Sequence, residues 1–344
     1  MTLGAWASVF VVSAGALVLA GIYLARAGDE IATVTGVGGL LVGGILLAGA
    51  TSLPEVATDV TAVLEGAPSL AVGDLFGSSM ANMAILAVID LVGRRHVLPA
   101  VELAHAQIGS IAMALTALAV IGVATPVGLA IGWIGMDTLV VGIAYVTAIV
   151  WVRRSRAERA RNGTGPELTR QTLRPTGWGV RGADGAGLRS ALLRFGLAAA
   201  GVVVSAPLVA IAAKGLAEEA AIGETAIGTS LVAVATSLPE LVASLAAVRI
   251  GAHDLAVGNL FGSNALNMGI LLVIDIAYVE GPLLSSVMSA SAIVAGVGAL
   301  LLMALAIAIV VGGTETRIRR LEPDAVLLLA AYVGCLAAVW FTST

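Results

Sequence analysis

Long apolar runs separated by short polar connections recur along almost the whole chain. Most of these runs approach or exceed the length of about 20 residues that a helix needs to cross a bilayer. They do not alternate with polar residues, as the strands of a membrane β-barrel do. The pattern predicts an all-α polytopic membrane protein with ten transmembrane helices. We expect these helices near residues 6–25, 33–64, 70–92, 103–124, 137–152, 191–213, 222–249, 255–278, 284–311 and 324–342.

One long polar segment, residues 153–190, divides the chain. It is rich in Arg and Gly and lacks apolar periodicity, which is typical of a loop. We therefore expect two halves of five helices each, residues 1–152 and residues 191–344, joined by a solvated linker.

Composition excludes a soluble protein. Of the 344 residues 59% are hydrophobic and 12% are charged, whereas soluble chains carry about 25% charged residues. So few charges cannot cover a water-exposed surface. Cys335 is the only cysteine in the sequence, so neither a disulfide framework nor a CxxC metal site is expected.

The basic residues predict an orientation in the membrane. If the N-terminus lies outside, 17 of the 18 Lys and Arg residues fall at the cytoplasmic side of the ten helices, and Lys214 is the exception. Cytoplasmic loops carry an excess of Lys and Arg. We therefore expect both termini outside the cytoplasm and the linker 153–190 inside it.

The chain contains an internal repeat. Shifted by 185 residues, the segment 46–90 aligns without a gap to 231–275, with 27 of 45 positions identical. The two cores of the match are Ala-Thr-Ser-Leu-Pro-Glu (50–55 and 235–240) and Gly-Asp/Asn-Leu-Phe-Gly-Ser (73–78 and 258–263). Because each half holds an odd number of helices, the second half runs through the membrane in the opposite sense. Inverted repeats are typical of secondary transporters, whose substrate sites lie near the bilayer midplane.

Glu55 and Glu240 occupy the same place in the two copies, deep inside apolar segments. A carboxylate inside a bilayer is costly and is normally paired or functional. No Lys or Arg lies within either segment at a depth that allows pairing. A cation from solution is the simplest counter-charge, and a protonated, hydrogen-bonded core Glu is the alternative.

Other oxygen atoms accompany the two glutamates. Pro54 and Pro239 remove a helical hydrogen bond and distort the preceding turn, which exposes carbonyl groups. On that turn four residues add hydroxyls: Thr51, Ser52, Thr236 and Ser237. Two further sets are spaced i, i+4, i+8 on one helix face: Asp74, Ser78 and Asn82, and Asn259, Ser263 and Asn267.

This ligand set holds no His and no Cys, so it favours hard cations such as Ca²⁺ and Na⁺. The two glutamates supply two negative charges. One Ca²⁺ balances them, and so do two or more Na⁺ ions. Mutually exclusive occupancy of one such site is what an exchanger requires.

These paired motifs resemble those of the cation/Ca²⁺ exchanger superfamily, specifically the prokaryotic Na⁺/Ca²⁺ exchangers (sodium/calcium antiporters). The resemblance extends over essentially the whole chain. It implies a secondary active antiporter that exchanges Ca²⁺ for Na⁺ by alternating access, with no enzymatic activity and no cofactor. It also implies a multi-pass protein of the cell membrane whose partners are the lipid bilayer and the ions, without nucleic acid, and whose monomer suffices for transport.

The resemblance also assigns roles to residues. Glu55 and Glu240 would be the carboxylates shared by Ca²⁺ and Na⁺, and the carbonyls of Ala48 and Ala233 would serve Na⁺. The remaining implied ligands are Thr51, Ser52, Ser78, Asn82, Thr236, Ser237, Ser263 and Asn267. In that family the first and sixth spans slide against the rest to alternate access.

Two aspartates in the first repeat depart from the family pattern. Asp59 and Asp74 correspond to Ser244 and Asn259 in the second repeat. We hypothesise that both line an outer vestibule and attract cations, or that they shift the site toward another divalent ion. The alternative is that each pairs with a neighbouring hydroxyl or amide.

Other functions remain open at this point. An H⁺-coupled exchanger, or an exchanger of another divalent cation such as Mg²⁺ or Mn²⁺, could use the same ligands. A cation channel is a more distant alternative. A membrane enzyme is disfavoured, because no nucleophile–base pair is readable and the three histidines lie away from the glutamate motifs.

Overall fold

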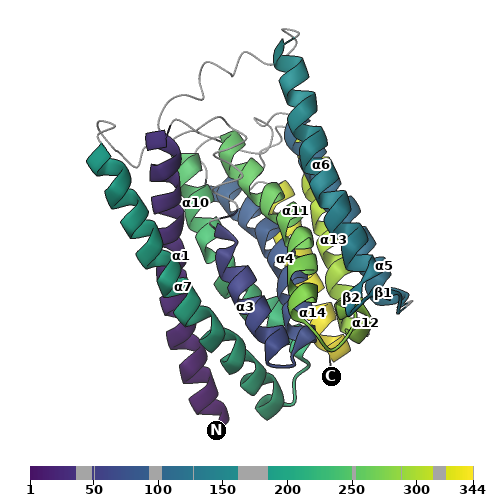
Figure 1. Cartoon of the computed structure of the whole chain (residues 1–344). Helices are drawn as coiled ribbons and strands as arrows, with labels where there is room; N and C mark the ends of the chain where they lie inside the picture. The colour runs from purple at the N-terminus through teal and green to yellow at the C-terminus, as the bar shows by residue number, and fades with distance from the viewer. Residues whose placement is uncertain are drawn as a thin grey trace.

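A computed structural model describes residues 1–35, 49, 51–92, 103–126, 128–161, 185–249, 253–287, 289–312 and 323–343. Long helices stand side by side and form one bundle (Figure 1). The described helices before the linker are α1 (Leu3–Thr35), α3 (Leu53–Leu64), α4 (Pro68–Val92), α5 (Leu103–Ala124) and α6 (Met136–Arg161). Those after it are α7 (Gly185–Ala220), α8 (Glu224–Ile227), η3 (Gly228–Val232), α9 (Ala233–Thr236), α10 (Leu238–Arg249), α11 (His253–Ala277), α12 (Leu283–Ser286), α13 (Ala290–Gly312) and α14 (Pro323–Ser343).

Within the described part of the chain, 7 helices are long and apolar enough to cross a membrane, or 8 if the bent pair Glu224–Thr236 and Leu238–Arg249 is one span. The apolar part of α6, Met136–Val152, is shorter. The second predicted span, 33–64, falls partly on residues 36–48 and 50, which lie outside the described residues. The helical membrane class is therefore confirmed, and the count of ten stays a prediction.

Several predicted boundaries were wrong. Helix α6 continues to Arg161 and α7 begins at Gly185, so both described ends of the segment 153–190 are helical. Its Arg, Ala and Glu residues are good helix formers, which lets α6 extend beyond its apolar part. The span expected at 284–311 is divided into α12 and α13. A short antiparallel hairpin of β1 (Ala130–Ile131) and β2 (Ile134–Gly135), which the sequence reading did not predict, precedes α6.

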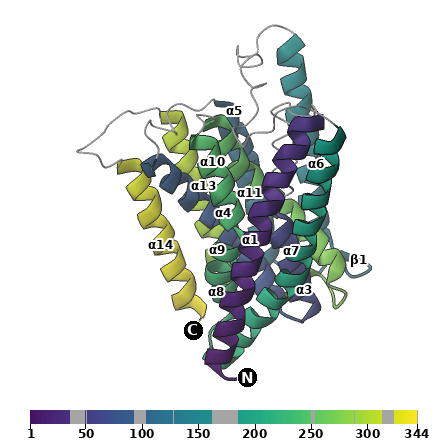
Figure 2. The same cartoon turned by 90° about the vertical axis from the view of Figure 1, so that its left-hand side faces the viewer.

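Helices α1 and α7 pack against one another along most of their length, at one side of the bundle (Figures 1 and 2). Small residues permit this close contact, as is common between transmembrane helices. A Cβ added at Gly201 of α7 would lie 3.1 Å from the Ala20 Cβ of α1, and the Trp6 ring packs on Gly215.

Helices α3, α4, α10 and α11 repeat with the register of the sequence. Helices α3 and α10 have 12 residues each, α4 and α11 have 25 each, and all four pairs of bounds are offset by the 185 residues of the sequence repeat. Helix α3 ends at the same end of the bundle as the two termini, whereas α10 ends at the opposite end (Figure 1). The two copies therefore run in opposite senses, as the odd number of predicted helices per half requires.

Candidate functional site

Each Thr-Ser-Leu-Pro-Glu segment forms a break between two helical pieces. At the break Ser52 has φ −87° and ψ 3°, and Ser237 has φ −87° and ψ 1°. In the second copy the flanking helices bend by 43°. Pro54 and Pro239 were expected to interrupt a helix, but each stands in the first turn of the helix that follows the break. Proline is tolerated there because the first amides of a helix have no intrahelical partner.

The break places Glu55 in the first turn of α3 and Glu240 in the first turn of α10. Both side chains are at most 1% exposed. The N-terminus of a helix carries a partial positive charge that stabilises a nearby carboxylate. Local backbone geometry thus offsets a part of the cost of burying these charges.

A π-helix, η3 (Gly228–Val232), lies just before the second break and was not predicted. Such segments occur often at functional sites. Helix α4 packs tightly on this stretch: a Cβ added at Gly77 would lie 2.5 Å from the Thr229 Cα and 2.7 Å from the Ala233 Cβ. This contact brings the polar face of α4 next to the break that carries Thr236.

Four buried carboxyl groups form a continuous cluster around the two breaks. Glu55 interacts electrostatically with Glu240 and Asp74, and Asp59 interacts with Asp74 and Glu55. None of the four has a lysine or arginine among the groups that act on it. Two ion pairs in the described part of the chain, Arg194–Glu30 and Lys214–Glu218, involve residues outside this cluster. When these carboxyl groups are ionised, no lysine or arginine among the described residues balances their charge.

Hydroxyl groups from both repeats approach these carboxylates. Asp74 Oδ1 accepts hydrogen bonds from the hydroxyls of Thr236 at 3.2 Å and Ser78 at 3.4 Å. The hydroxyls of Thr51 and Ser52 face Glu240. Four of the predicted ligands thus lie beside the carboxyl cluster, to which Asp74 belongs: Thr51, Ser52, Ser78 and Thr236.

Amide side chains form the contact between α4 and α11. Asn82 Nδ2 donates to Asn264 Oδ1 at 2.8 Å, and Asn264 Nδ2 donates to the Ser79 carbonyl at 3.2 Å. The sequence reading missed Asn264, because Ser79 at the matching position made the pair look unrelated. Asn267 is fully buried, and neither polar atom of its side chain has a hydrogen-bond partner.

Many polar atoms at the site are buried without a hydrogen bond, which is unusual in a folded protein and calls for an explanation. Among the predicted ligands these atoms are Ser52 Oγ, Glu55 Oε2, Asn82 Oδ1, Ser237 Oγ, Glu240 Oε1 and Oε2, Ser263 Oγ and both polar side-chain atoms of Asn267. Thr58 and Thr229, which were not predicted, have orphaned hydroxyls as well. Oxygen atoms in this state suit a hard cation. No group of three His, Cys, Asp or Glu side chains suited to a metal occurs in the described residues, so a bound cation would also need the neutral oxygens.

Of the two carbonyl ligands that the resemblance implies, the structure describes only the one of Ala233. The Ala233 carbonyl accepts the Ser237 amide at 3.0 Å and lies 3.3 Å from the Thr236 hydroxyl. It would serve an ion only by sharing or exchanging these contacts. Ala48 lies outside the described residues.

The two extra aspartates do not line an open vestibule. Asp59 and Asp74 are both fully buried, and they lie within the carboxyl cluster. Asp74 pairs with neighbouring hydroxyls, as the alternative reading held, whereas no donor reaches either oxygen of Asp59.

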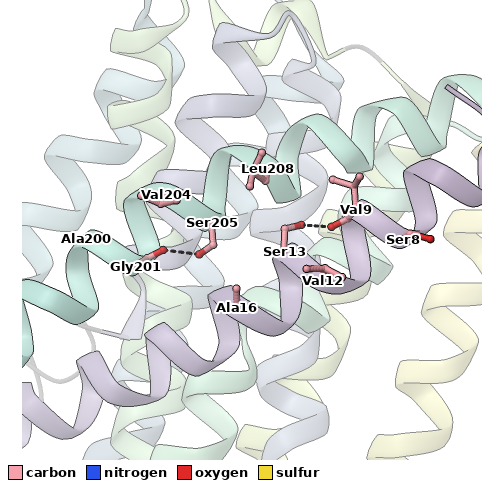
Figure 3. Close-up of a pocket in the computed structure, with 10 residues that line it drawn as sticks. All are labelled: Ser8, Val9, Val12, Ser13, Ala16, Ala200, Gly201, Val204, Ser205 and Leu208. Carbon is pink, nitrogen blue, oxygen red and sulfur yellow. Dashed lines mark hydrogen bonds between the residues drawn. The ribbon is translucent and has the colours of Figure 1, made fainter.

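A cavity of about 770 Å³ between α1 and α7 is separate from this cluster. Apolar and small side chains line it, and its Ser13 and Ser205 hydroxyls donate to carbonyls of their own helices at 2.7 Å (Figure 3). It therefore offers no free polar ligand and is not the ion site.

A comparison with protein-family models matches residues 5–153 and 190–341 to the family described as sodium/calcium exchanger protein. The chain belongs to the sodium/calcium exchanger family. The matched ranges flank the linker and contain both Thr-Ser-Leu-Pro-Glu segments.

Individual relatives of this exchanger-family chain match over shorter stretches. The inner membrane protein YrbG of Escherichia coli is 29% identical over 222 residues, 64% of either chain. The sodium/calcium exchanger MaX1 of Methanosarcina acetivorans is 52% identical over 44 residues, 13% of either chain. The chain thus covers less than two thirds of the length of each relative.

A solved structure of the sodium-calcium exchanger NCX_Mj, soaked with 2.5 mM Na⁺ and 0.1 mM Ca²⁺, matches the whole fold. The match has a TM-score of 0.61 at 22% identity and covers 98% of this chain and 99% of the other. At this identity the likeness concerns the fold.

Proposed function

We propose that this protein exchanges Ca²⁺ for Na⁺ across the membrane by alternating access at a midplane site built from the two Thr-Ser-Leu-Pro-Glu segments. The observation that carries the proposal is the meeting of Glu55 and Glu240. They come from matching positions of two repeats, interact with one another, are buried, and have no basic partner among the described residues.

Charge balance favours these two ions. A buried pair of carboxylates accepts one Ca²⁺ or two Na⁺, and each load excludes the other. The surrounding hydroxyls and amides are hard neutral ligands that both ions accept. Membership in the sodium/calcium exchanger family and the names of MaX1 and NCX_Mj support the same pair of ions.

Transport driven by different gradients tests the proposal. In proteoliposomes of the purified full-length chain, an outward Na⁺ gradient should drive uptake of radioactive calcium above its equilibrium level. Uptake driven by a pH gradient alone would support the H⁺-coupled alternative, and Mg²⁺ or Mn²⁺ competition would reveal another divalent substrate. Calcium flux that only runs down its own gradient, with no Na⁺ movement, would indicate a channel.

Removal of one charge tests the site itself. Glu55→Gln and Glu240→Gln should each abolish Na⁺-driven uptake, because a single carboxylate no longer balances Ca²⁺. Glu65→Gln is the matched control, since this glutamate is exposed just after α3 and touches none of the cluster through its carboxylate. Near-normal flux in either site variant would refute the assignment.

We further propose that the protein lies in the cell membrane with both termini outside and the linker 153–190 in the cytoplasm. The position of both termini at one end of the bundle supports a shared side for them (Figure 1), and the Arg-rich linker favours the cytoplasm for the opposite side. No enzymatic step and no cofactor is part of the proposal, and one chain contains all of the proposed ligands.

A further inference from the structure

Two carboxyl groups in the cluster face each other at close range. Asp59 of α3 and Asp74 of α4 are fully buried. Their carboxyl groups lie within hydrogen-bond reach of each other if one of them is protonated. No hydrogen-bond donor reaches either oxygen of Asp59. Two neighbouring carboxylates repel each other strongly when they are removed from water.

The two oxygens of Asp74 have different surroundings. Oδ1 accepts from Thr236 and Ser78, whereas Oδ2 is buried without a partner. Oδ2 and the two oxygens of Asp59 are therefore available to the same ligand. The hydroxyls hold Asp74 in place without balancing its charge.

The second repeat shows which side chains the packing requires at the positions of Asp59 and Asp74. The matching residues are Ser244 and Asn259, and Asn259 Nδ2 donates to Ser244 Oγ at 3.4 Å. A neutral pair joined by one hydrogen bond thus fits between α10 and α11, although Asn259 Oδ1 has no partner. Packing between the corresponding helices α3 and α4 does not by itself require two acids.

We propose that Asp59 and Asp74 form a second cation site, which holds a divalent ion such as Ca²⁺ beside the ion bound by Glu55 and Glu240. This inference rests on the proposed function, because it assigns a further load to the same transport site. Four buried carboxylates carry four negative charges, and two divalent ions balance them.

The second site lies toward the end of the bundle that holds the termini. Asp59 follows Glu55 by four residues in α3, which places it about 6 Å further along the helix, in the direction of the α3–α4 connection. An ion arriving from that end would meet Asp59 before Glu55. The two sites are then occupied in series.

Direct counting of bound calcium tests the proposal. Equilibrium dialysis of the purified full-length protein with radioactive calcium, without Na⁺, should give two ions per wild-type chain. Asp59→Ser alone, and Asp59→Ser with Asp74→Asn, should each give one. The double variant copies the Ser244–Asn259 pair, so it should fold, and thermal unfolding in detergent checks this. Ser244→Ala is the matched control and should still bind two.

The outcomes separate this inference from the proposed function. A wild-type chain that binds one ion, or Asp59 variants that still bind two with unchanged affinity, would overturn the second site. Loss of an ion in the Asp59 variants, together with two bound ions in Glu55→Gln with Glu240→Gln, would keep the second site and overturn the first. The Asp59 variants could also bind as many calcium ions as the wild type while releasing fewer protons on binding. That result would show that Asp59 and Asp74 hold a proton rather than an ion, against the proposal.

Discussion

At the scale of single residues, hydrogen-bond partners divide the buried acids into two kinds. Asp275 accepts from the amides of Gly135 and Leu283, at 2.8 Å each, and from the Thr138 hydroxyl. Glu240, equally buried, has no donor with full hydrogen-bond geometry on either oxygen. The fold therefore uses Asp275 to fix the hairpin and the α11–α12 connection, while Glu240 is left for a ligand.

This difference predicts a stability effect at Asp275. Asp275→Ala should destabilise the protein by about 3 kcal/mol, because buried donors lose a charged acceptor. Unfolding in detergent by a graded denaturant should show the loss, and calcium binding by the folded fraction should persist. Glu219→Ala, on an exposed residue, should change stability by less than about 0.5 kcal/mol. A similarly small effect at Asp275 would contradict this structural role.

The internal repeat allowed some residues of the candidate site to be predicted from the sequence, whereas others were missed. Glu55 and Glu240 were predictable because both copies preserve them inside an apolar run. Asp275 and its counterpart in the first repeat, Asp90, both lie near the end of a helix, and the bonds of Asp275 to the hairpin and to α12 fit such a place. Asn264 and Thr229 were missed, since their importance depends on which helices face each other, and single positions carry no sign of that.

At the scale of helices, α1 meets both breaks at one glycine. A Cβ added at Gly21 would lie 2.5 Å from the Pro239 Cγ and 3.4 Å from the Pro54 Cγ. Gly21 therefore allows α1 to lie directly against the turns that carry the proposed ligands. If α1 slides during transport, as the family resemblance implies, this glycine would provide the smooth point of contact that such movement needs.

A larger side chain at this point should obstruct transport. For Gly21→Val we expect Na⁺-driven uptake to fall roughly tenfold or more, since overpacking costs about 1–3 kcal/mol. Calcium binding at equilibrium should change far less, because Gly21 is not a ligand. Gly15→Val on the same helix is the control, as its added Cβ would meet nothing within 4 Å. Equal uptake by the two variants would argue against a moving α1.

The breaks show why helix details were harder to predict than helix existence. The apolar runs predicted the helices. A proline, however, can interrupt a helix or begin one, and the backbone hydrogen bonds decide which of these occurs. The π-helix at Gly228–Val232 depends on the fit of α4 against that stretch. The division of the 284–311 span into α12 and α13 likewise follows from local backbone geometry that hydropathy does not record.

At the scale of the molecule, charge and topology are consistent with one another. Lys214 of α7 donates to the Glu65 carbonyl near the end of the bundle that holds the termini. Arg189 lies 25 residues earlier on the same helix, a separation of about 37 Å along its axis. A bilayer fits between these two positions.

Labelling of single cysteines should reveal the orientation. In a Cys335→Ser background, Glu65→Cys should react with a membrane-impermeant maleimide in intact cells. Arg189→Cys should react only after the membrane is opened. Both positions are exposed at helix ends, so accessibility depends on the side of the membrane. The reverse pattern would place the termini in the cytoplasm.

The class of the molecule was predictable because the bilayer imposes helix length and composition. The sequence repeat also foretold the inverted pairs α3–α4 and α10–α11. The number of complete spans was less accessible, since α6 has a short apolar part and a long polar extension. Hydropathy records where a helix is apolar and not where it stops.

The unequal contacts of Gly21 with the two breaks suggest how the helices would pack in the opposite-facing state of the protein. Its counterpart 185 residues later is Ala206, which is fully buried in α7. At present Gly21 lies nearer to Pro239 than to Pro54. If the repeats exchange conformations under alternating access, Ala206 should come into contact with Pro54, and its methyl group should keep it slightly further away than Gly21 now lies from Pro239. A structure determined in the opposite-facing state would test this by that one distance.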